Sequence, residues 1–334
     1  MKIVFFETMP GEEAYFRSAS TIPAGTELEF HTDTLSPQTV GRAAGADVVS
    51  VFVKSELTPD VLAQLPDLKL ITTRSMGYEH IAVSDAKGRG MKVRNVTTYA
   101  AHPVAEFTFA LLLAVARHLY PASEQMREAS DFSNVQFVGK DLIGATLGVV
   151  GTGRIGREVV KIAKGFSMQV IAHDALPDAA FATDIGFRYV PMDELLATSD
   201  VITLHVPALP ETVHMIDATA FGKMKKGSIL INTSRGEVID TPALVAALKD
   251  GTLWGAGLDV LEAERELADK ADALQKGATS LYRTLVADNA LLDLPNVIVT
   301  PHMAYNTEKS RIEIMRATAQ SIGDWAADKE QPYL

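Results

Sequence analysis

Short apolar runs, mainly of β-branched residues, alternate along the chain with stretches of helical periodicity. In the first hundred residues this pattern predicts helices at 59–64 and 83–88 between the apolar runs. The apolar runs predict strands at 2–6, 48–53, 70–73 and 92–94. Such alternation is typical of α/β layers built around parallel sheets.

A second alternating set follows an expected helix at about 103–118, which Pro103 can open because the first helical turn needs no N–H there. Its six expected strands, the number in a dinucleotide-binding fold, are 147–150, 170–172, 201–204, 229–232, 255–258 and 297–300. The charged, Ala-rich segment 262–289 is expected to be helical. The residues after Pro301 are too few for a further domain, so we expect them to return to the first one.

The prediction is therefore an α/β protein with two doubly wound parallel-sheet domains. A flavodoxin-like substrate domain would comprise residues 1–99 and 302–334. A Rossmann cofactor domain of residues 100–301 would be inserted into it.

Charge and composition restrict the function further. A net charge of -11 argues against nucleic-acid and anionic-membrane partners, because both need a basic surface. The chain has no cysteine, which excludes disulfides, thiolate catalysis and zinc–thiolate sites and fits a reducing cytoplasm. The apolar start is too short for a signal peptide, and the run at 109–116 is too short to span a bilayer. We expect a cytoplasmic protein that needs no metal.

A glycine motif, G-x-G-x-x-G at 151–156, stands directly after an expected strand and before an expected helix. Its glycines permit a tight turn, close approach of a pyrophosphate and helix–strand packing. Asp174 ends the next strand, 18 residues beyond Gly156. Its carboxylate can accept hydrogen bonds from ribose hydroxyls and repels a 2′-phosphate, so the cofactor is expected to be NAD; the alternative is a solvated strand-end acid. The residues expected at the cofactor are Gly151, Gly153, Arg154, Ile155, Gly156, Asp174, His205, Val206, Pro207, Thr212, Thr233, Ser234, Asp259 and His302.

Three later strand ends carry residues suited to acid–base chemistry on a carboxylate substrate. Arg235 can bind a carboxylate with two N–H groups, although a surface salt bridge would be the better explanation of this arginine taken alone. His302 can act as acid or base near neutral pH, and a carboxylate beside it would stabilise the imidazolium. Glu264 is the expected partner; Glu262 is its rival, and spacing from Asp259 favours Glu264.

Together these motifs resemble the D-isomer-specific 2-hydroxyacid dehydrogenase family over nearly the whole chain. The segments that carry the resemblance are 151–156 with Asp174, 232–236, 257–260 with Glu264, and 300–302. Its D-lactate dehydrogenase branch is the most similar, through residues 74–81, Tyr99, the long insert between Glu264 and His302, and residues 303–305.

The resemblance implies NAD-dependent reduction of a small 2-keto acid, pyruvate first, to the D-2-hydroxy acid. Arg235 would bind the carboxylate and carbonyl, His302 would supply the proton, Glu264 would orient His302, and Asp259 would hold the nicotinamide end. Substrate contacts would come from Ser75, Met76, Gly77, Tyr99 and Tyr305. A homodimer through the cofactor domain is also implied.

Two departures from the family pattern leave the substrate open. Residues 100–103 replace the usual Ser-Pro-type sequence after the tyrosine, and Lys54 stands near where an aromatic lid residue is usual. Lys54 is either a solvated loop lysine or a substrate-binding cation that favours a second negative charge. The alternatives are therefore glyoxylate, hydroxypyruvate, a bulkier or dicarboxylic 2-keto acid, or phosphite. A binding protein of the corepressor type, which senses NAD without catalysis, is a further alternative.

Overall fold

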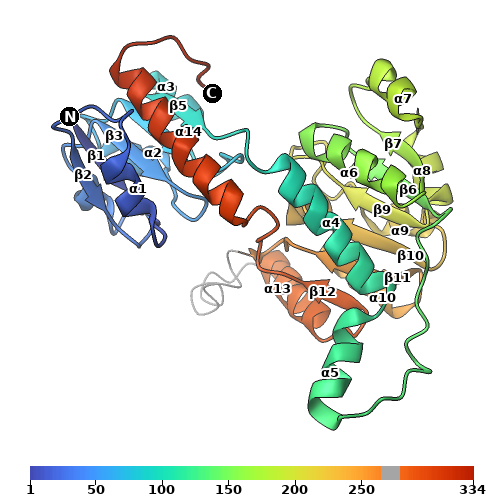
Figure 1. Ribbon diagram of the computed structural model, residues 1–334. Helices are drawn as coiled ribbons and strands as arrows, with labels where there is room; N and C mark the ends of the chain where they lie inside the picture. Colours follow the sequence, from blue (N-terminus) through green and yellow to red (C-terminus); the bar gives the residue numbers. More distant parts are fainter. Residues whose placement is uncertain (265–278) are drawn as a thin grey trace. The chain divides into compact units, whose positions relative to one another are not determined.

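The computed structural model describes residues 1–264 and 279–334 of the chain, which divides into two compact units (Figure 1). Unit 1 comprises Met1–Ala100 and Asn306–Leu334, and unit 2 comprises Ala101–Tyr305. Both are α/β structures with all-parallel sheets, so the predicted fold class is confirmed.

Unit 1 is built on a five-stranded sheet in the order β2-β1-β3-β4-β5, the flavodoxin-like order. The strands are β1 (Lys2–Phe5), β2 (Glu27–Phe30), β3 (Val48–Val51), β4 (Leu70–Thr73) and β5 (Lys92–Asn95). The helical segments are α1 (Glu12–Ser18), η1 (Val40–Ala43), α2 (Pro59–Ala63), α3 (Val83–Gly88) and α14 (Glu308–Ala326).

Alternating side chains of β1 divide the core of unit 1 between the two faces of its sheet. Ile3 and Phe5 pack with Phe16 of α1 and Ile322 of α14, whereas Val4 packs with the helices α2 and α3. The C-terminal helix is therefore part of the core of unit 1, although it follows unit 2 in the sequence.

Unit 2 is built on a seven-stranded sheet in the order β12-β11-β10-β9-β6-β7-β8, a Rossmann order with one added strand. The strands are β6 (Thr146–Val150), β7 (Gln169–His173), β8 (Arg188–Tyr189), β9 (Val201–Leu204), β10 (Ser228–Asn232), β11 (Leu253–Leu258) and β12 (Val297–Val299). The helical segments are α4 (Ala101–Ala116), α5 (Leu119–Ala129), α6 (Arg154–Gly165), α7 (Ala179–Ile185), α8 (Met192–Thr198), α9 (Ala218–Lys223), η2 (Gly236–Val238), α10 (Thr241–Lys249) and α13 (Thr279–Leu292).

Helices cover both faces of this sheet. Side chains of α4 and α6 pack on one face with Val149 and Ile231, and those of α8, α9 and α10 pack on the other with Ile202 and Leu230. Strands buried on both faces read as continuous apolar runs, which explains why six of the seven were predicted.

The secondary structure differs from expectation in two respects. The edge strands β2 and β8 were not predicted, and the helix expected from Pro103 begins two residues earlier and ends at Ala116. Half of the residues of α4 are buried. Of the segment expected to be helical at 262–289, residues 265–278 lie outside the described residues, and α13 occupies the rest from Thr279.

Among the described residues, no single helix is long and apolar enough to cross a membrane. Only α4 and α5 taken together, with a bend of 61° between them, reach that length and composition. The buried side chains of α4 belong to the core of unit 2.

Candidate active site

The candidate residues of unit 2 follow the carboxyl ends of its parallel strands. The glycine loop follows β6, Asp174 follows β7, His205 follows β9, Thr233–Arg235 follow β10, Asp259 follows β11, and His302 follows β12. Because these ends lie along one edge of the sheet, the structure brings these segments to the edge where open α/β sheets bind ligands.

The glycine loop allows two backbone segments to meet at distances that no side chain would permit. Gly151 has φ +90°, and a Cβ there would lie 2.7 Å from the carbonyl oxygen of His205 and 2.9 Å from Val206. A Cβ on Gly156 would lie 2.0 Å from the carbonyl oxygen of Gly151. Gly153 has open space at its Cβ position, and no side chain caps α6, which begins at Arg154. This uncapped helix start is suited to bind an anionic group such as a pyrophosphate.

Asp174 is held against the glycine loop by three hydrogen bonds. Its Oδ2 accepts from the N–H of Thr152 at 2.6 Å and from the Thr152 hydroxyl at 2.8 Å, and its Oδ1 accepts from the N–H of Leu176 at 2.8 Å. Tyr189 donates in turn to the Thr152 hydroxyl at 2.8 Å. Desolvation raises the pKa of Asp174, but the hydrogen bonds from Leu176 and Thr152 outweigh it and the pKa is lowered. The carboxylate is therefore ionised and fixed in orientation.

His205 adds a buried polar atom beside the same loop. Its Nε2 lies 2.9 Å from the Thr203 hydroxyl, whereas its Nδ1 is buried and has no hydrogen-bond partner among the described residues. Burial lowers the pKa of His205 to about 3, so its ring is neutral. An unpartnered neutral nitrogen beside a glycine cradle fits a site for a polar cofactor.

Thr212 holds the turn after His205 together. Its hydroxyl donates to the carbonyl of Pro207 at 2.5 Å and accepts from the N–H of Leu209 at 2.8 Å. The hydroxyl contacts of Thr212 are thus made within the 207–212 turn.

Asn232 shapes the loop that carries Arg235. Its Oδ1 accepts from the N–H and the hydroxyl of Ser234, at 3.0 and 2.8 Å, and its Nδ2 donates to the carbonyl of Arg235 at 2.8 Å. The Thr233 hydroxyl donates to Thr108 of α4 at 3.0 Å. Arg235 itself is half-buried, and its Nη1 donates to the carbonyl of Ser234 at 2.7 Å.

Asp259 anchors the turn that carries His302. Its buried carboxylate accepts from the Thr300 hydroxyl at 2.5 Å and from the N–H groups of Met303 and Ala304 at 2.9 and 2.8 Å. Its carbonyl accepts from the N–H of His302 at 2.8 Å. Burial raises the pKa of Asp259 despite these hydrogen bonds. Tyr305, at the end of the same turn, is half-buried.

His302 and Glu264 form the central contact of the candidate site. The Nδ1 of His302 lies 3.0 Å from Oε1 of Glu264. Burial raises the pKa of Glu264, but the hydrogen bond and charge of His302, a backbone hydrogen bond with Leu261 and the charge of Arg235 together outweigh it, and the pKa is lowered. Glu262 points elsewhere, with its carboxylate on His214 and Thr241. Of the two rival glutamates, Glu264 is thus the one that contacts His302.

In unit 1 the candidate substrate residues likewise follow strand ends. Lys54 follows β3, Ser75–Gly77 follow β4, and Tyr99 follows β5. No hydrogen bond within the described part of the chain uses the N–H groups of Met76 and Gly77, whereas the Ser75 hydroxyl donates to the Gly77 carbonyl at 2.7 Å. These two amides are suited to bind an anion. Tyr99 is buried.

Two buried charged residues fix these loops. The carboxylate of Glu7 accepts from the N–H groups of Phe52, Lys54 and Ser55 at 2.8–3.0 Å. Arg74, which is fully buried, donates to the carbonyls of residues 6, 7 and 50 at 2.6–3.2 Å and pairs with Glu12 at 3.3 Å. The main chain of Lys54 is thus held, while its side chain is exposed.

Sequence reasoning assigned no role to the residues that hold the candidates in place. They are Glu7, Thr152, Tyr189, Asn232 and Thr300. Thr152, Asn232 and Thr300 lie within the motif segments, whereas only their strand-end positions could have indicated Glu7 and Tyr189. Within the described residues there is no cluster of three or more His, Asp or Glu side chains that could hold a metal ion.

Comparisons with known proteins agree with this geometry. Residues 109–304 match the family described as "D-isomer specific 2-hydroxyacid dehydrogenase, NAD binding domain". The chain is 36% identical to a D-lactate dehydrogenase of Curvularia clavata, over 98% of this chain and 92% of the relative. It is 34% identical to a glyoxylate reductase of Korarchaeum cryptofilum, over 92% of this chain and 88% of the relative. The crystal structure of D-lactate dehydrogenase from Aquifex aeolicus, complexed with NAD and lactic acid, superimposes with a TM-score of 0.86 at 34% identity, covering 98% of this chain and 96% of that one.

Proposed function

The chain belongs to the D-isomer specific 2-hydroxyacid dehydrogenase family, and from this premise we propose that it reduces pyruvate to D-lactate with NADH. Membership makes it an NAD-dependent enzyme acting on 2-hydroxy and 2-keto acids; the choice of pyruvate and the residue roles are the proposal. The observation that carries the proposal is the 3.0 Å contact between His302 and Glu264 at a strand end.

His302 is the proton donor in the proposed reaction. Because Glu264 accepts from Nδ1, the ring is held in one orientation and Nε2 is left to carry the exchangeable proton. The lowered pKa of Glu264 keeps that carboxylate ionised, which stabilises the imidazolium. When bound, NADH supplies the hydride that is added to the carbonyl carbon, and His302 gives its proton to the carbonyl oxygen. Arg235 binds the carboxylate and polarises the carbonyl.

The cofactor would be held by the edge of the unit 2 sheet described above. The start of α6 at Gly153, Arg154 and Ile155 would bind the pyrophosphate. Asp174 would accept from the ribose hydroxyls and discriminate against NADP. The segments at His205–Pro207 and Thr233–Ser234 would line the remainder, with Asp259 setting the turn at the nicotinamide end.

We propose the remaining substrate contacts as the sequence predicts them. The N–H groups at Ser75, Met76 and Gly77 would bind the substrate carboxylate, and Tyr99 and Tyr305 would also contact the substrate. We propose a cytoplasmic location, with which the absence of cysteine is compatible.

Lys54 favours a second candidate substrate class. Its side chain is exposed, and the carboxylate of Glu7 fixes its main chain at 2.8 Å. A cation presented by a fixed loop would favour a dicarboxylic 2-keto acid such as oxaloacetate. To decide between these substrate classes, we propose to measure rates of NADH oxidation for the wild type and for Lys54→Met. The acids to compare are pyruvate, phenylpyruvate, oxaloacetate, 2-ketoglutarate, glyoxylate and hydroxypyruvate.

The same screen separates the remaining alternatives. A preference for glyoxylate or hydroxypyruvate would replace pyruvate as the substrate, and phosphite-dependent NAD reduction would indicate the phosphite alternative. Binding of NADH without oxidation by any acid would favour a corepressor-like binding protein.

The test of the proton-donor role is His302→Ala. We expect kcat for the preferred keto acid to fall by about 10²–10⁴-fold, because general acid catalysis is lost. The Kd for NADH, measured by fluorescence titration, should change little. A variant that keeps the wild-type kcat would refute the assignment.

A further inference from the structure

The segment between β11 and Glu264 is attached to the rest of unit 2 at three points. The backbone of Gly236 lies so close that a Cβ there would be 2.1 Å from the carbonyl carbon of Leu261. The N–H of Ala263 donates to the buried Asp288 of α13 at 3.0 Å. The third attachment is the side chain of Glu262.

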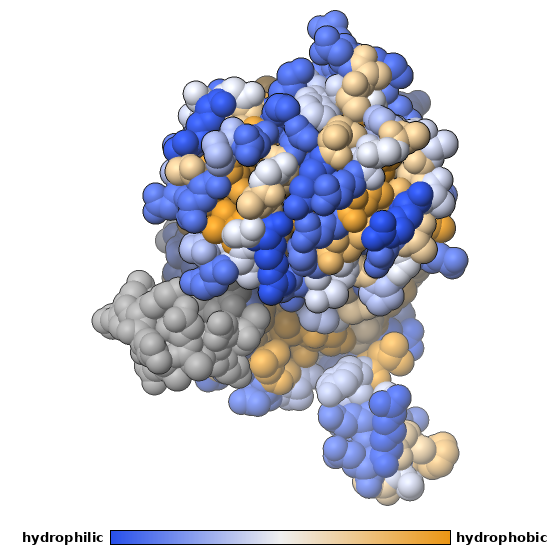
Figure 2. Space-filling model, turned by 90° about the vertical axis from the view of Figure 1, so that its left-hand side faces the viewer, coloured by the Kyte–Doolittle hydropathy of each residue, from blue (hydrophilic) through white to orange (hydrophobic). Residues whose placement is uncertain are grey.

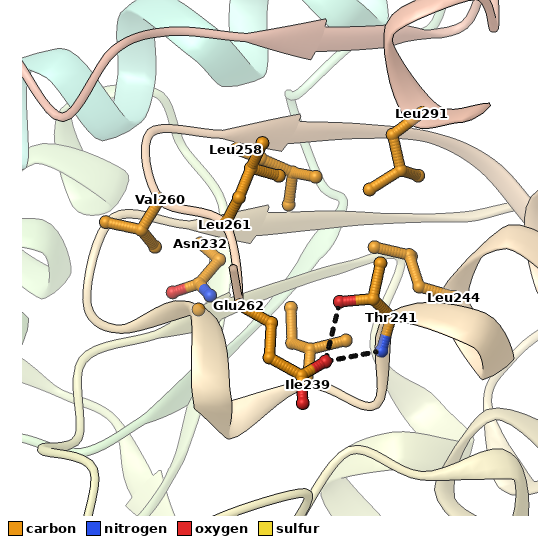
Figure 3. Close-up of a pocket in the computed structure, with 10 residues that line it drawn as sticks. Asn232, Ile239, Thr241, Leu244, Leu258, Val260, Leu261, Glu262 and Leu291 are labelled. Carbon is orange, nitrogen blue, oxygen red and sulfur yellow. Dashed lines mark hydrogen bonds between the residues drawn. The ribbon is translucent and has the colours of Figure 1, made fainter. Parts of the chain in front are cut away.

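Glu262 links this segment to two other elements through both of its carboxylate oxygens. Its Oε2 accepts from the hydroxyl and the N–H of Thr241, at 2.9 and 3.3 Å, at the first turn of α10. Its Oε1 lies 2.6 Å from Nε2 of His214, in the loop before α9. Figure 3 shows the carboxylate turned toward Thr241. We call Glu262, Thr241 and His214 the clamp.

Glu262 and Thr241 of the clamp line a small, mainly apolar cavity. Its volume is about 10 Å³, and its wall includes Leu244, Leu258 and Leu291 (Figure 3). That volume is at the lower limit of the space a water molecule needs, so the segment is seated with little room to move. The Glu262 side chain is only 15% exposed, which fits a packing position rather than contact with substrate. Loss of the carboxylate would enlarge the space and release the segment.

Glu264 stands two residues beyond the clamp and reaches His302. Its Oε1 contact at 3.0 Å is the one that orients the imidazole in the proposed reaction. A shift of the segment by a fraction of an ångström would lengthen this contact, and such misplacement lowers rate steeply.

We propose that Glu262 is a positioning residue for the reaction: through Thr241 and His214 it fixes the main chain at 261–263 and so holds Glu264 against His302. The proposal rests on the proposed function, because it assigns Glu264 the role of orienting His302. Glu262 touches no reacting atom in this scheme; it acts only through Glu264.

The experiment is a double-mutant cycle on kcat for keto-acid reduction, with Glu262→Ala, Glu264→Ala and the double variant. We expect Glu262→Ala to lower kcat by about 10- to 100-fold, with an unchanged Kd for NADH. In the Glu264→Ala background the same change should lower kcat by less than about threefold, because the effect passes through Glu264. Glu262→Gln, whose amide oxygen can still accept from Thr241, should restore most of the activity.

The matched control is Glu237→Ala, an exposed glutamate of η2, the segment that approaches Leu261 through Gly236; it should leave kcat unchanged. A wild-type kcat in Glu262→Ala, or an equal fall in both backgrounds, would overturn the proposal. If Glu262→Ala fails to fold, Thr241→Val removes one clamp hydrogen bond and must reproduce the non-additive loss. Wild-type activity of Glu264→Ala would instead overturn the proposed function, so the two failures can be told apart.

Discussion

His302 has a backbone conformation that side-chain-bearing residues rarely adopt. Its φ is +51°, and its N–H donates to the carbonyls of Thr300 and Asp259 at 2.9 and 2.8 Å. The carboxylate of Asp259 holds the residues on both sides of His302. Left-handed backbone at a non-glycine residue costs free energy and persists only where neighbours impose it. The buried aspartate is that neighbour, and it directs the imidazole toward Glu264.

Arg235 gives a residue-scale prediction about substrate binding. We expect Arg235→Lys to lower kcat/KM for the keto acid by about 10- to 100-fold, because a point charge cannot replace a forked, charged hydrogen-bond pair. Steady-state kinetics at saturating NADH measures this. The control is Arg316→Lys, an exposed residue of α14 paired with Glu313, which should leave kcat/KM unchanged. Unaltered kinetics in Arg235→Lys would refute the role.

The Glu264–His302 pair gives a prediction about pH. The pKa of Glu264 is lowered because His302 first, then a backbone hydrogen bond with Leu261 and the charge of Arg235, outweigh desolvation. The contribution of the pair to the stability of the folded protein is therefore fully present at pH values above the unfolded-state pKa of Glu264. It is lost as the pH falls through the lower pKa that Glu264 has in the folded state. In His302→Ala the desolvation of Glu264 remains, but the hydrogen bond and charge of His302 that oppose it are lost. The pKa of Glu264 should therefore rise.

Carbon-13 NMR titration of the Glu264 carboxyl checks the direction of that shift. The resonance is assigned by its loss in Glu264→Gln. An equal titration midpoint in the wild type and in His302→Ala would contradict the inferred pairing.

Among the elements, ten of the twelve strands were predictable, including the edge strands β5 and β12, whereas the edge strands β2 and β8 were not. The interior strands are buried on both faces and carry uninterrupted apolar runs. Strand β2 alternates as Glu27-Leu28-Glu29-Phe30 within a polar stretch, and β8 has only two residues, Arg188 and Tyr189. Neither has an apolar run long enough to separate it from a loop.

The candidate site was also only partly predictable, because the sequence indicates positions at strand ends but not the contacts between side chains. The strand-end positions of Asp174, Arg235 and His302 could be read from the sequence, because each follows an apolar run. The partners that orient them could not, since Thr152 and Asn232 act through hydrogen bonds whose geometry depends on the folded loops. Spacing from Asp259 favoured Glu264 over Glu262, but the contacts themselves depend on the folded segment, which directs Glu264 to His302 and Glu262 to His214.

Gly236 gives the element-scale prediction. It opens η2 directly after Arg235, and a Cβ there would meet the carbonyl carbon and oxygen of Leu261 at 2.1 and 2.2 Å. Because the opposing atoms are backbone, Gly236→Ala must separate the Arg235 loop from the segment that carries Glu264. We expect a loss of about 1–3 kcal/mol in the free energy of unfolding and a lower kcat. Denaturant unfolding and steady-state kinetics measure the two effects.

Gly222→Ala in α9 is the matched control. Its Cβ position is open within 4 Å, so the substitution should leave kcat unchanged and stability equal or slightly higher. Equal behaviour of the two alanine variants would show that the close approach at Gly236 does not matter.

At the scale of the whole molecule, contacts within unit 2 do not account for the stability of the helix α5. It has eleven residues, none of them buried, and it projects from the rest of unit 2 (Figure 1). An isolated helix of that length is marginal in water without a partner. The segment that follows exposes large apolar side chains, with Phe132 at 87%, Val135 at 83% and Val138 at 71% exposure. Figure 2 shows this projection with hydrophobic atoms among hydrophilic ones.

We propose that a second copy of the chain covers these side chains, which gives the homodimer through the cofactor unit that the family resemblance implies. We expect the wild type to have the mass of a dimer in light scattering at micromolar concentration. Phe132→Asp with Val135→Asp should shift it to monomer, because charge on a buried interface is costly. Ile312→Asp, which changes a 50% exposed apolar residue of α14 in unit 1, should stay dimeric. A monomeric wild type, or an unchanged dimer in the double variant, would show that α5 and the segment after it have another purpose.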